Sequence, residues 1–268
     1  MKKTRLVYVL TALFLGIFCA ENVSAQKKYV WNGEWNVSSS FEPARLTIKT
    51  LSGNKFKFHL DASNGANVGE ISGVAKIKGN KAFFDDREST AKDAPKEGCL
   101  LTFTNKGASI EVKQNEKCTH YAGNAVYFEG DYTKGKAQKL NDNFVKRKVF
   151  PNIKLDQKFK LLTGKDYQNF LDSFQLISPE EDLDGLGATG FSACVRGICP
   201  YYAGIIMFDA KGNLWAAVIF IDDKNKTFVN YYTNVSAWTD KMPKTLENWV
   251  DDKRSANDDL TVIFKNKK

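Results

Sequence analysis

The side chains that most often catalyse reactions at neutral pH are scarce in this chain. Its two histidines, His59 and His120, both fall in the first half, far in sequence from Cys194. A Ser-His-Asp or Cys-His arrangement needs an imidazole as general base. His59 sits in an alternating segment, which indicates a surface position. Glycosidase chemistry needs only two carboxylates, so a carboxylate-based hydrolase remains the alternative to a protein that is not an enzyme.

Four of the five cysteines are spaced as two local pairs. Cys99 is close in sequence to Cys118 and Cys194 to Cys199, whereas Cys19 lies in the apolar start of the chain. Metal sites usually contain Cys-x2-Cys spacings, and neither pair has one. An even number of cysteines in an oxidising compartment indicates disulfides. We therefore predict the bonds Cys99–Cys118 and Cys194–Cys199, and we expect no metal and no cofactor.

Positive charge is concentrated between the two halves of the chain. The net charge is +8, and the segment from Thr133 to Lys160 contains nine basic residues against two carboxylates. Such a segment attracts polyanions through a long-range field that salt weakens. Lys146, Arg147 and Lys148 form its densest run, and we predict that they bind an anionic partner. The alternative is a solvated linker. Nucleic acid is not expected, because stacking aromatics are few among these charges.

Two other segments could recognise a ligand. If Cys194 and Cys199 are bonded, residues 195–198 form a stiff loop that presents Arg196 beside two tyrosines. An arginine on a stiff loop loses little entropy on docking; the alternative is a stapled turn without a partner. The acidic stretch 180–184 hints at calcium, but it lacks the closing glutamate of an EF-hand loop. For that stretch we favour a capped turn or a local partner for the basic connector.

The first 25 residues have the pattern of a cleavable export signal. A basic start precedes an apolar run from Leu6 to Ala20, and small residues lie at both subsites of a cleavage point after Ala25. Fifteen residues are too few for a comfortable membrane span, which needs about 20. We therefore predict a periplasmic or secreted chain without a transmembrane segment after cleavage.

Residues 26–133 are predicted to form an antiparallel β-barrel-like domain. Alternating segments such as Leu46–Leu51 and Lys55–Leu60 are separated by turn residues, and about seven such strands follow one another without a convincing helix. Short strands at this spacing are typical of a closed or half-closed barrel. Gly69 and Gly73 fall within one strand and predict bends or bulges.

Residues 161–268 are predicted to form an α+β domain with a meander sheet and two helices. A helical stripe of apolar residues follows Asp166, and a second helix follows Pro243. Between them, three apolar runs from 204 to 233 are separated by turns, and a last strand is expected over 260–264. Segment 180–190 is expected to be irregular. The basic connector, residues 134–160, joins the two domains.

The first domain resembles small β modules of exported bacterial proteins without assigned activity. The resemblance rests on residues 67–73, on Cys99–Phe103 with Cys118, and on Gly130-Asp131-Tyr132. The expected architecture is also similar to that of periplasmic lysozyme inhibitors, which are small disulfide-tied barrels. These resemblances imply a fold and an exported location.

From these observations we expect an exported, non-enzymatic envelope protein. Its partner would be an anionic cell-wall or membrane component, or an acidic protein. The alternatives are the carboxylate-based hydrolase of envelope polymers and a periplasmic inhibitor or immunity protein. The sequence leaves the oligomeric state open.

Overall fold

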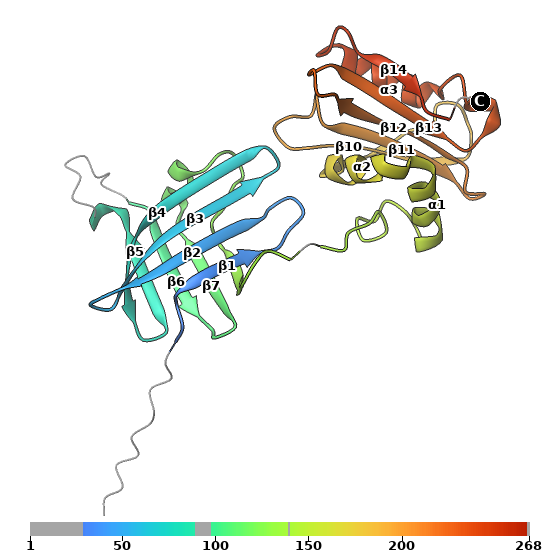
Figure 1. The fold of residues 1–268 in the computed structure, drawn as a ribbon. Helices are drawn as coiled ribbons and strands as arrows, with labels where there is room; N and C mark the ends of the chain where they lie inside the picture. Colours follow the sequence, from blue (N-terminus) through green and yellow to red (C-terminus); the bar gives the residue numbers. More distant parts are fainter. Residues whose placement is uncertain (1–28, 89–97, 139, 267–268) are drawn as a thin grey trace, which may run out of the picture.

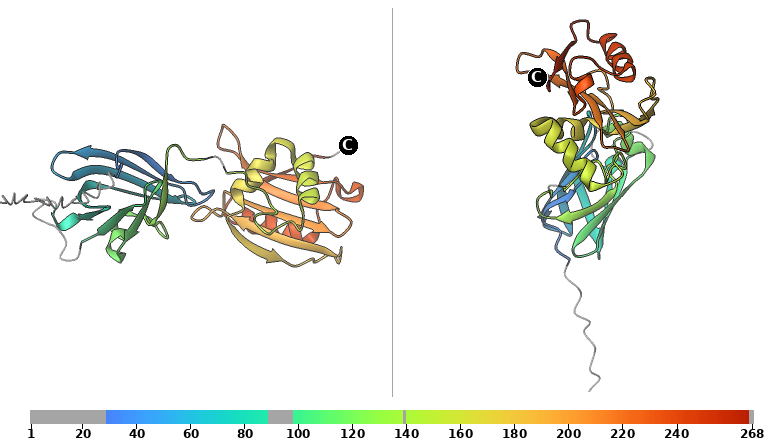
Figure 2. Two further views of the ribbon diagram at one scale, coloured as in Figure 1. Left: turned by 90° about the horizontal axis from the view of Figure 1, so that it is seen from below. Right: turned by 90° about the vertical axis from the view of Figure 1, so that its right-hand side faces the viewer.

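Two domains make up the part of the chain that the computed structural model describes, residues 29–88, 98–138 and 140–266 (Figure 1). The first is a closed antiparallel barrel, and the second is a six-stranded sheet with helices on both faces. Figure 2 shows them end to end. The predicted fold class is therefore confirmed. The predicted export signal and Cys19 lie outside the described residues.

Eight strands close the barrel. Neighbours in sequence pair throughout, and the first strand also pairs with the last, with Trp35 opposite Lys134. The sequence predicted about seven strands, and the first one was not among them. The strands are β1 (Gly33–Val37), β2 (Ala44–Leu51), β3 (Lys55–Asn64), β4 (Asn67–Lys78), β5 (Lys81–Asp85), β6 (Leu100–Asn105), β7 (Ser109–Gln114) and β8 (Gly130–Lys134).

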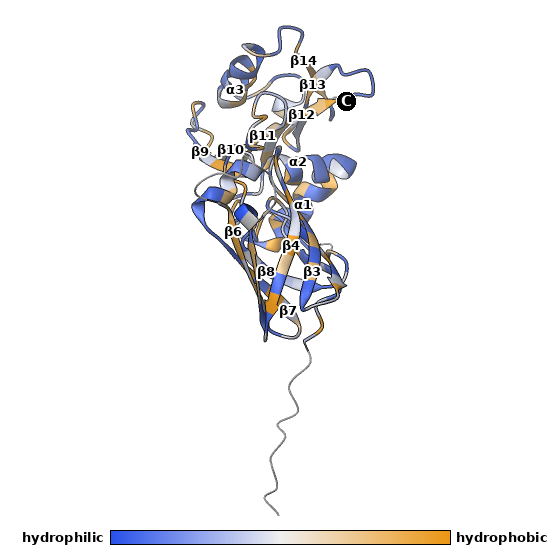
Figure 3. Cartoon of the chain, turned by 90° about the vertical axis from the view of Figure 1, so that its left-hand side faces the viewer, coloured by the Kyte–Doolittle hydropathy of each residue, from blue (hydrophilic) through white to orange (hydrophobic). Residues whose placement is uncertain are grey.

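Strict in-and-out alternation fills the barrel. Every second residue of β3 is buried, from Phe56 to Asn64, because successive side chains of a strand point to opposite faces. Figure 3 shows hydrophobic and hydrophilic residues mixed along the barrel strands. Phe56 and Phe103 meet edge to face, with ring centroids 5.4 Å apart. The predicted Cys99–Cys118 bond is confirmed at 2.04 Å between the sulfurs.

Gly69 and Gly73 do not form bulges. The pairing of β3 with β4 runs without interruption from Lys55–Lys76 to Asn64–Asn67, so neither glycine marks a bulge. A Cβ atom on Gly73 would lie 2.3 Å from the ring of Phe84, and one on Gly69 would lie 2.9 Å from the Cβ of Ala122. The glycines therefore let neighbouring groups approach the strand closely.

The second domain contains one sheet in which the strand order follows the chain. Its strands are antiparallel except the last pair, in which β14 runs parallel to β13. They are β9 (Leu176–Glu180), β10 (Ala188–Cys194), β11 (Ala203–Asp209), β12 (Leu214–Ile221), β13 (Thr227–Thr233) and β14 (Thr261–Phe264). The three meander strands and the final strand were predicted. The prediction of an irregular segment over 180–190 missed β10, whose first residues lie there, and β9 just before it. Pro179 lies in β9, the edge strand of this sheet, where a missing N–H is tolerated.

Helices cover both faces of this sheet. Helix α1 (Ile153–Thr163) and helix α2 (Tyr167–Ser173) lie on one face, and α3 (Lys244–Arg254) lies on the other (Figure 1). Because both faces are covered, β12 is buried from Leu214 to Ile219, and such strands read as continuous apolar runs rather than alternating ones. The chain also forms short 3-10 turns, Asp86–Glu88, Glu116–Tyr121, Gly164–Asp166 and Ser236–Trp238.

Most of the predicted basic connector belongs to the second domain. Helix α1 begins within it, so the domain has three helices where two were predicted. Phe144, Phe150 and Phe159 are buried in the core between α1, α2 and the sheet. The ring of Phe144 lies 5.5 Å from that of Phe150 and 5.4 Å from that of Phe159. Lysines between these phenylalanines hid the apolar pattern, because the buried residues come singly or in pairs.

One end of the barrel docks on the second domain. The tip of the β3–β4 hairpin carries Gly65 with a positive φ of 62°, and its neighbours contact two residues of the other domain. The amide N–H of Ala66 donates to the carbonyl of Arg196 at 3.2 Å, and Gln175 donates to the side chain of Asn64 at 2.7 Å. A Cβ on Gly65 would lie 2.8 Å from the Arg196 carbonyl, so glycine permits this close approach.

Candidate functional site

The basic run predicted to bind an anionic partner is divided in the structure. Lys146 and Lys148 are exposed, whereas the side chain of Arg147 is only 9% exposed. Its guanidinium donates to Asp142 and to the carbonyls of Leu171 and Phe174, and it stacks 4.4 Å above the ring of Phe41 in the barrel. Arg147 is therefore engaged at the domain junction, and we leave it out of the proposed binding surface.

Asp142 is held ionised at this junction. Burial acts to raise its pKa, but hydrogen bonds from Arg147, Ser40 and the amide of Asn143, together with the attraction of the guanidinium, leave its pKa below the ordinary value. Arg147 is the more buried partner, so removing Asp142 would leave its charge without compensation, which makes this pair costly to break. Both partners of the pair contact the barrel, Asp142 through Ser40 and Arg147 through Phe41.

The exposed lysines gather on one layer of the second domain. We call residues 144–174 the basic layer; they comprise the turn before α1, α1 and α2, and hold seven basic and three acidic residues. Its exposed lysines are Lys146, Lys148, Lys154, Lys158, Lys160 and Lys165. Lys154 and Lys158 are one helical turn apart, which places them on the same face of α1.

Two of the three carboxylates of the basic layer point inward. Asp156 is 4% exposed and accepts hydrogen bonds from the amide of Phe144 at 3.0 Å and the hydroxyl of Tyr167 at 2.8 Å. Asp166 is 3% exposed and accepts from Asn230 and from the hydroxyl of Tyr232. Burial, and then these carboxylates, raise the pKa of both tyrosines, which keeps their hydroxyls protonated as donors. The lysines consequently dominate the outer surface of the layer.

A lysine-lined pocket of about 250 Å³ lies beside the start of α1. Lys154, Lys158 and Lys211 line it together with Asn152. The side chain of Asn152 caps α1 by accepting from the amide of Leu155 at 3.0 Å. Lys158 donates to the carbonyl of Gly212, which ties the helix to the β11–β12 turn. Lys211 thereby extends the exposed positive surface beyond α1.

The opposite helical layer carries the opposite charge. We call residues 180–187 and 236–260 the acidic layer; they hold ten acidic and four basic residues. The two segments are bound together, since Asp184 accepts from the amide of Lys244 at 2.6 Å and Thr245 donates to the carbonyl of Glu181 at 2.7 Å. The second domain therefore has a positive layer on one face of its sheet and a negative layer on the other.

The acidic stretch 180–184 accepts hydrogen bonds from backbone amides of neighbouring segments. Asp184 accepts a hydrogen bond from the first amide of α3, that of Lys244. Burial acts to raise the pKa of Asp182, but hydrogen bonds from backbone amides such as Ala188 leave that pKa below its ordinary value. Among the described residues, no group of three or more metal-ligating side chains could hold an ion. These contacts agree with the capped turn that the sequence favoured over a calcium site.

Arg196 does not project freely from its loop. The predicted Cys194–Cys199 bond is confirmed, at 2.06 Å between the sulfurs. Arg196 is half-buried, its amide donates to Gln175 at 2.9 Å, and its carbonyl accepts from Ala66 of the barrel. Its Nε is buried without a hydrogen-bond partner. The stiff loop of the prediction therefore faces the barrel, because the hairpin tip covers it.

The barrel surface brings together a serine, a histidine and an aspartate that the sequence did not connect. His59 Nδ1 lies 2.7 Å from Ser72 Oγ, and His59 Nε2 lies 3.0 Å from Asp61 Oδ1. Arg45 holds the other Asp61 oxygen at 2.9 Å. The spacing of His59 and Asp61 on one strand face was visible in the sequence, whereas Ser72 joins them only through the β3–β4 register. The histidine side chain is 40% exposed.

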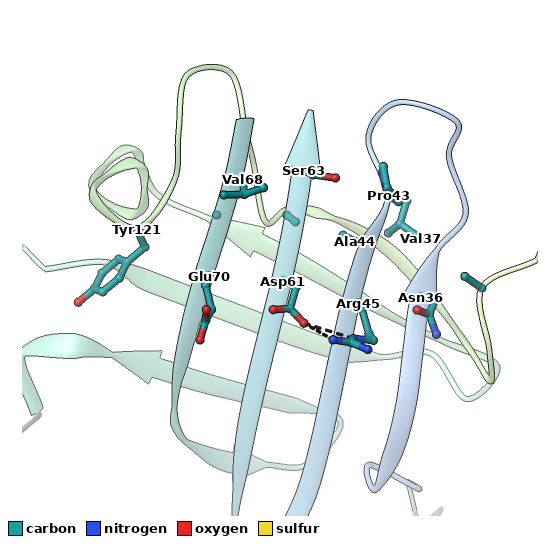
Figure 4. Close-up of a pocket in the computed structure, with 13 residues that line it drawn as sticks. Asn36, Val37, Pro43, Ala44, Arg45, Asp61, Ser63, Val68, Glu70 and Tyr121 are labelled. Atoms are coloured by element: carbon teal, nitrogen blue, oxygen red, sulfur yellow. Dashed lines mark hydrogen bonds and ion pairs between the residues drawn. The ribbon is translucent and has the colours of Figure 1, made fainter. Parts of the chain in front are cut away.

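A pocket of about 570 Å³ adjoins this array at the barrel end that faces the second domain. Figure 4 shows Arg45, Asp61 and Glu70 in a row across β2, β3 and β4, with Val68 and Ser63 toward the strand ends. Arg45 is already paired with Asp61, so the pocket offers little unpaired positive charge. Ser72 and His59 do not line it.

Comparisons with known proteins return no match: no family model, curated protein or solved structure is similar to the chain. The resemblance to exported β modules and lysozyme inhibitors therefore stays a prediction. No helix within the described residues is both long and apolar enough to span a bilayer.

Proposed function

We propose that this chain is an exported, non-enzymatic envelope protein that binds an anionic component of the cell envelope through its basic layer. The observation that carries the proposal is the arrangement of charge in residues 144–174. Six lysines are exposed, while Asp156 and Asp166 are buried against tyrosines. A surface of one sign attracts an oppositely charged polymer from a distance and raises the association rate.

Two further features support an exported location. Both disulfides join cysteines that are close in sequence, and disulfides persist in oxidising compartments such as the periplasm. The signal-like first 25 residues agree with such a compartment. In the envelope the available anions include lipid phosphates and acidic wall polymers.

Charge removal on the basic layer tests the proposal. A K154Q/K158Q/K160Q variant should lose at least tenfold in affinity for long-chain polyphosphate at low salt, because each exposed ammonium contributes to the attractive field. The matched control is K49Q/K57Q/K78Q, which removes the same charge from exposed positions on the barrel. Equal affinities for the two variants, or no binding of polyphosphate by the unmodified chain, would contradict the proposal.

A second candidate, hydrolysis, rests on the Ser72–His59–Asp61 array rather than on paired carboxylates. The imidazole links a serine to a carboxylate as in a Ser-His-Asp relay, although Ser72 meets Nδ1 and Asp61 meets Nε2, the reverse of that relay, and the array is exposed. A fluorophosphonate probe should label Ser72 if the histidine activates it, and the label should disappear in H59A. Absence of labelling in the unmodified chain would remove this candidate.

A further inference from the structure

Two exposed aliphatic side chains interrupt the lysines of α1. Leu161 is 86% exposed and Ile153 is 51% exposed. Leucine at this exposure gains nothing from the fold, whose core is already filled on the other side of the helix by Leu155 and Phe159. Single exposed apolar residues are common and need no explanation. The residues around Leu161 and Ile153 therefore decide whether these two side chains indicate a binding surface.

The neighbours of Leu161 are lysines. On an α-helix, residues three, four and seven apart share a face, so Leu161 lies beside Lys158 and Gln157 and in line with Lys154. Ile153 lies in the same row, one turn before Gln157 and two turns before Leu161. Lys160 borders this row on its other side, next to the Tyr167 ring at 5.4 Å from its centroid. The outer face of α1 is thus a row formed by Ile153, Gln157 and Leu161, with aliphatic side chains at its two ends and lysines on both sides.

A bilayer surface with anionic headgroups matches both parts of this face. Lysine ammonium groups meet lipid phosphates, and their alkyl stems let them remain at headgroup level while an aliphatic side chain reaches the acyl boundary. Basic residues close to an anionic leaflet each contribute attraction that decays within a Debye length. A hydrophilic wall polymer would engage the lysines but would leave Leu161 and Ile153 in water.

The negative charge on the opposite face of the sheet determines how the domain would be oriented on an anionic surface. The acidic layer lies across the sheet from α1, and an anionic surface repels it. Of the two helical layers, only the basic one can therefore face such a membrane at low energy. Attraction and repulsion act on the same body, so the domain presents α1 to the surface.

We infer that the second domain is a peripheral membrane-binding module, in which α1 lies on an anionic phospholipid surface and inserts Leu161 and Ile153 between the headgroups. This inference rests on the proposed function and names its partner. Only these two side chains reach the acyl boundary, because the apolar face of α1 with Leu155 and Phe159 packs on the sheet.

Leucine removal tests the inference separately from charge. The full chain should sediment with vesicles of phosphatidylglycerol and phosphatidylcholine in equal parts, and little with pure phosphatidylcholine. An L161Q variant should bind the anionic vesicles about tenfold more weakly, since burying a leucine contributes roughly that factor, while its affinity for long-chain polyphosphate stays unchanged. The matched control is L183Q, because Leu183 is 42% exposed in the acidic layer.

Insertion can also be observed directly. An L161W variant should show a blue-shifted tryptophan emission, relative to the unmodified chain, on addition of anionic vesicles. Binding to anionic vesicles that is the same for L161Q and L183Q would overturn the membrane inference and leave polyanion binding in place. If the unmodified chain does not bind polyphosphate at low salt, the proposed function itself is overturned.

Discussion

The basic layer and the acidic layer cover the same sheet, yet they use their carboxylates in opposite ways. In the basic layer Asp156 and Asp166 are buried and satisfied by hydroxyl and amide donors. In the acidic layer Asp251 and Asp252 are exposed on α3 and pair with neighbouring cations on the same helix. The comparison shows that the direction in which a charge points, as well as its number along the chain, decides the surface of a domain.

The largest expected effect concerns the aromatic cluster that holds the basic layer to the sheet. F144A should destabilise the second domain by about 3–5 kcal/mol, because it leaves a cavity among Phe150, Phe159 and Phe174. Urea unfolding, followed by hydrogen exchange in peptides from 144–174, measures the change. L161A in the same layer should unfold like the unmodified chain, as expected for an exposed side chain. A mild effect of F144A would mean that residues 134–160 are a linker after all.

The buried carboxylates give the next largest effect. D156A should cost about 2–3 kcal/mol, because it leaves the amide of Phe144 and the hydroxyl of Tyr167 buried without their acceptor. D251A, the matched change on the acidic layer, should leave the unfolding transition almost unchanged. Equal sensitivity of the two layers in urea unfolding would contradict the inward-and-outward contrast.

The domain junction should show a smaller effect that depends on pH. The pKa of Asp142 is lower in the folded chain than its ordinary value of 3.8, so its pair with Arg147 stabilises the fold above about pH 4. This contribution is lost as the pH falls through the lowered pKa. R147M should remove part of the acid dependence of unfolding between pH 5 and pH 2 and should loosen the two domains, as measured by small-angle scattering. R147K, which keeps the charge but not the planar fork, should restore the acid dependence only partly. An unchanged acid profile in R147M would show that the pair does not stabilise the junction.

The sequence predicted the barrel well because its physical signal is local. Alternation along β2 and β3 and the turn between them needed no knowledge of distant partners. The disulfides followed from spacing and were confirmed. The closing strand β1 was missed because only five residues form it and tryptophan and asparagine obscure its alternation.

The predictions failed where a residue's role depends on another part of the chain. Arg147 reads as one of three adjacent cations, and its partners Asp142, Leu171 and Phe41 come together only in the folded molecule. Arg196 reads as the tip of a free loop until the β3–β4 hairpin covers its backbone. The candidate site was predicted least well. The surface of the basic layer depends on which lysines of α1 face outward, and the sequence did not predict α1, which begins within the predicted connector.

Lysine acetylation of the full chain, with and without anionic vesicles, tests the central claim most directly, because the two layers serve as controls for each other. Mass spectrometry would quantify the modification of each exposed lysine. We predict that vesicles of phosphatidylglycerol and phosphatidylcholine protect three lysines of α1 in the basic layer, Lys154, Lys158 and Lys160. Two exposed lysines of the acidic layer, Lys241 and Lys244, should stay reactive. Equal protection of both sets, or protection of Lys241 and Lys244 alone, would contradict the account.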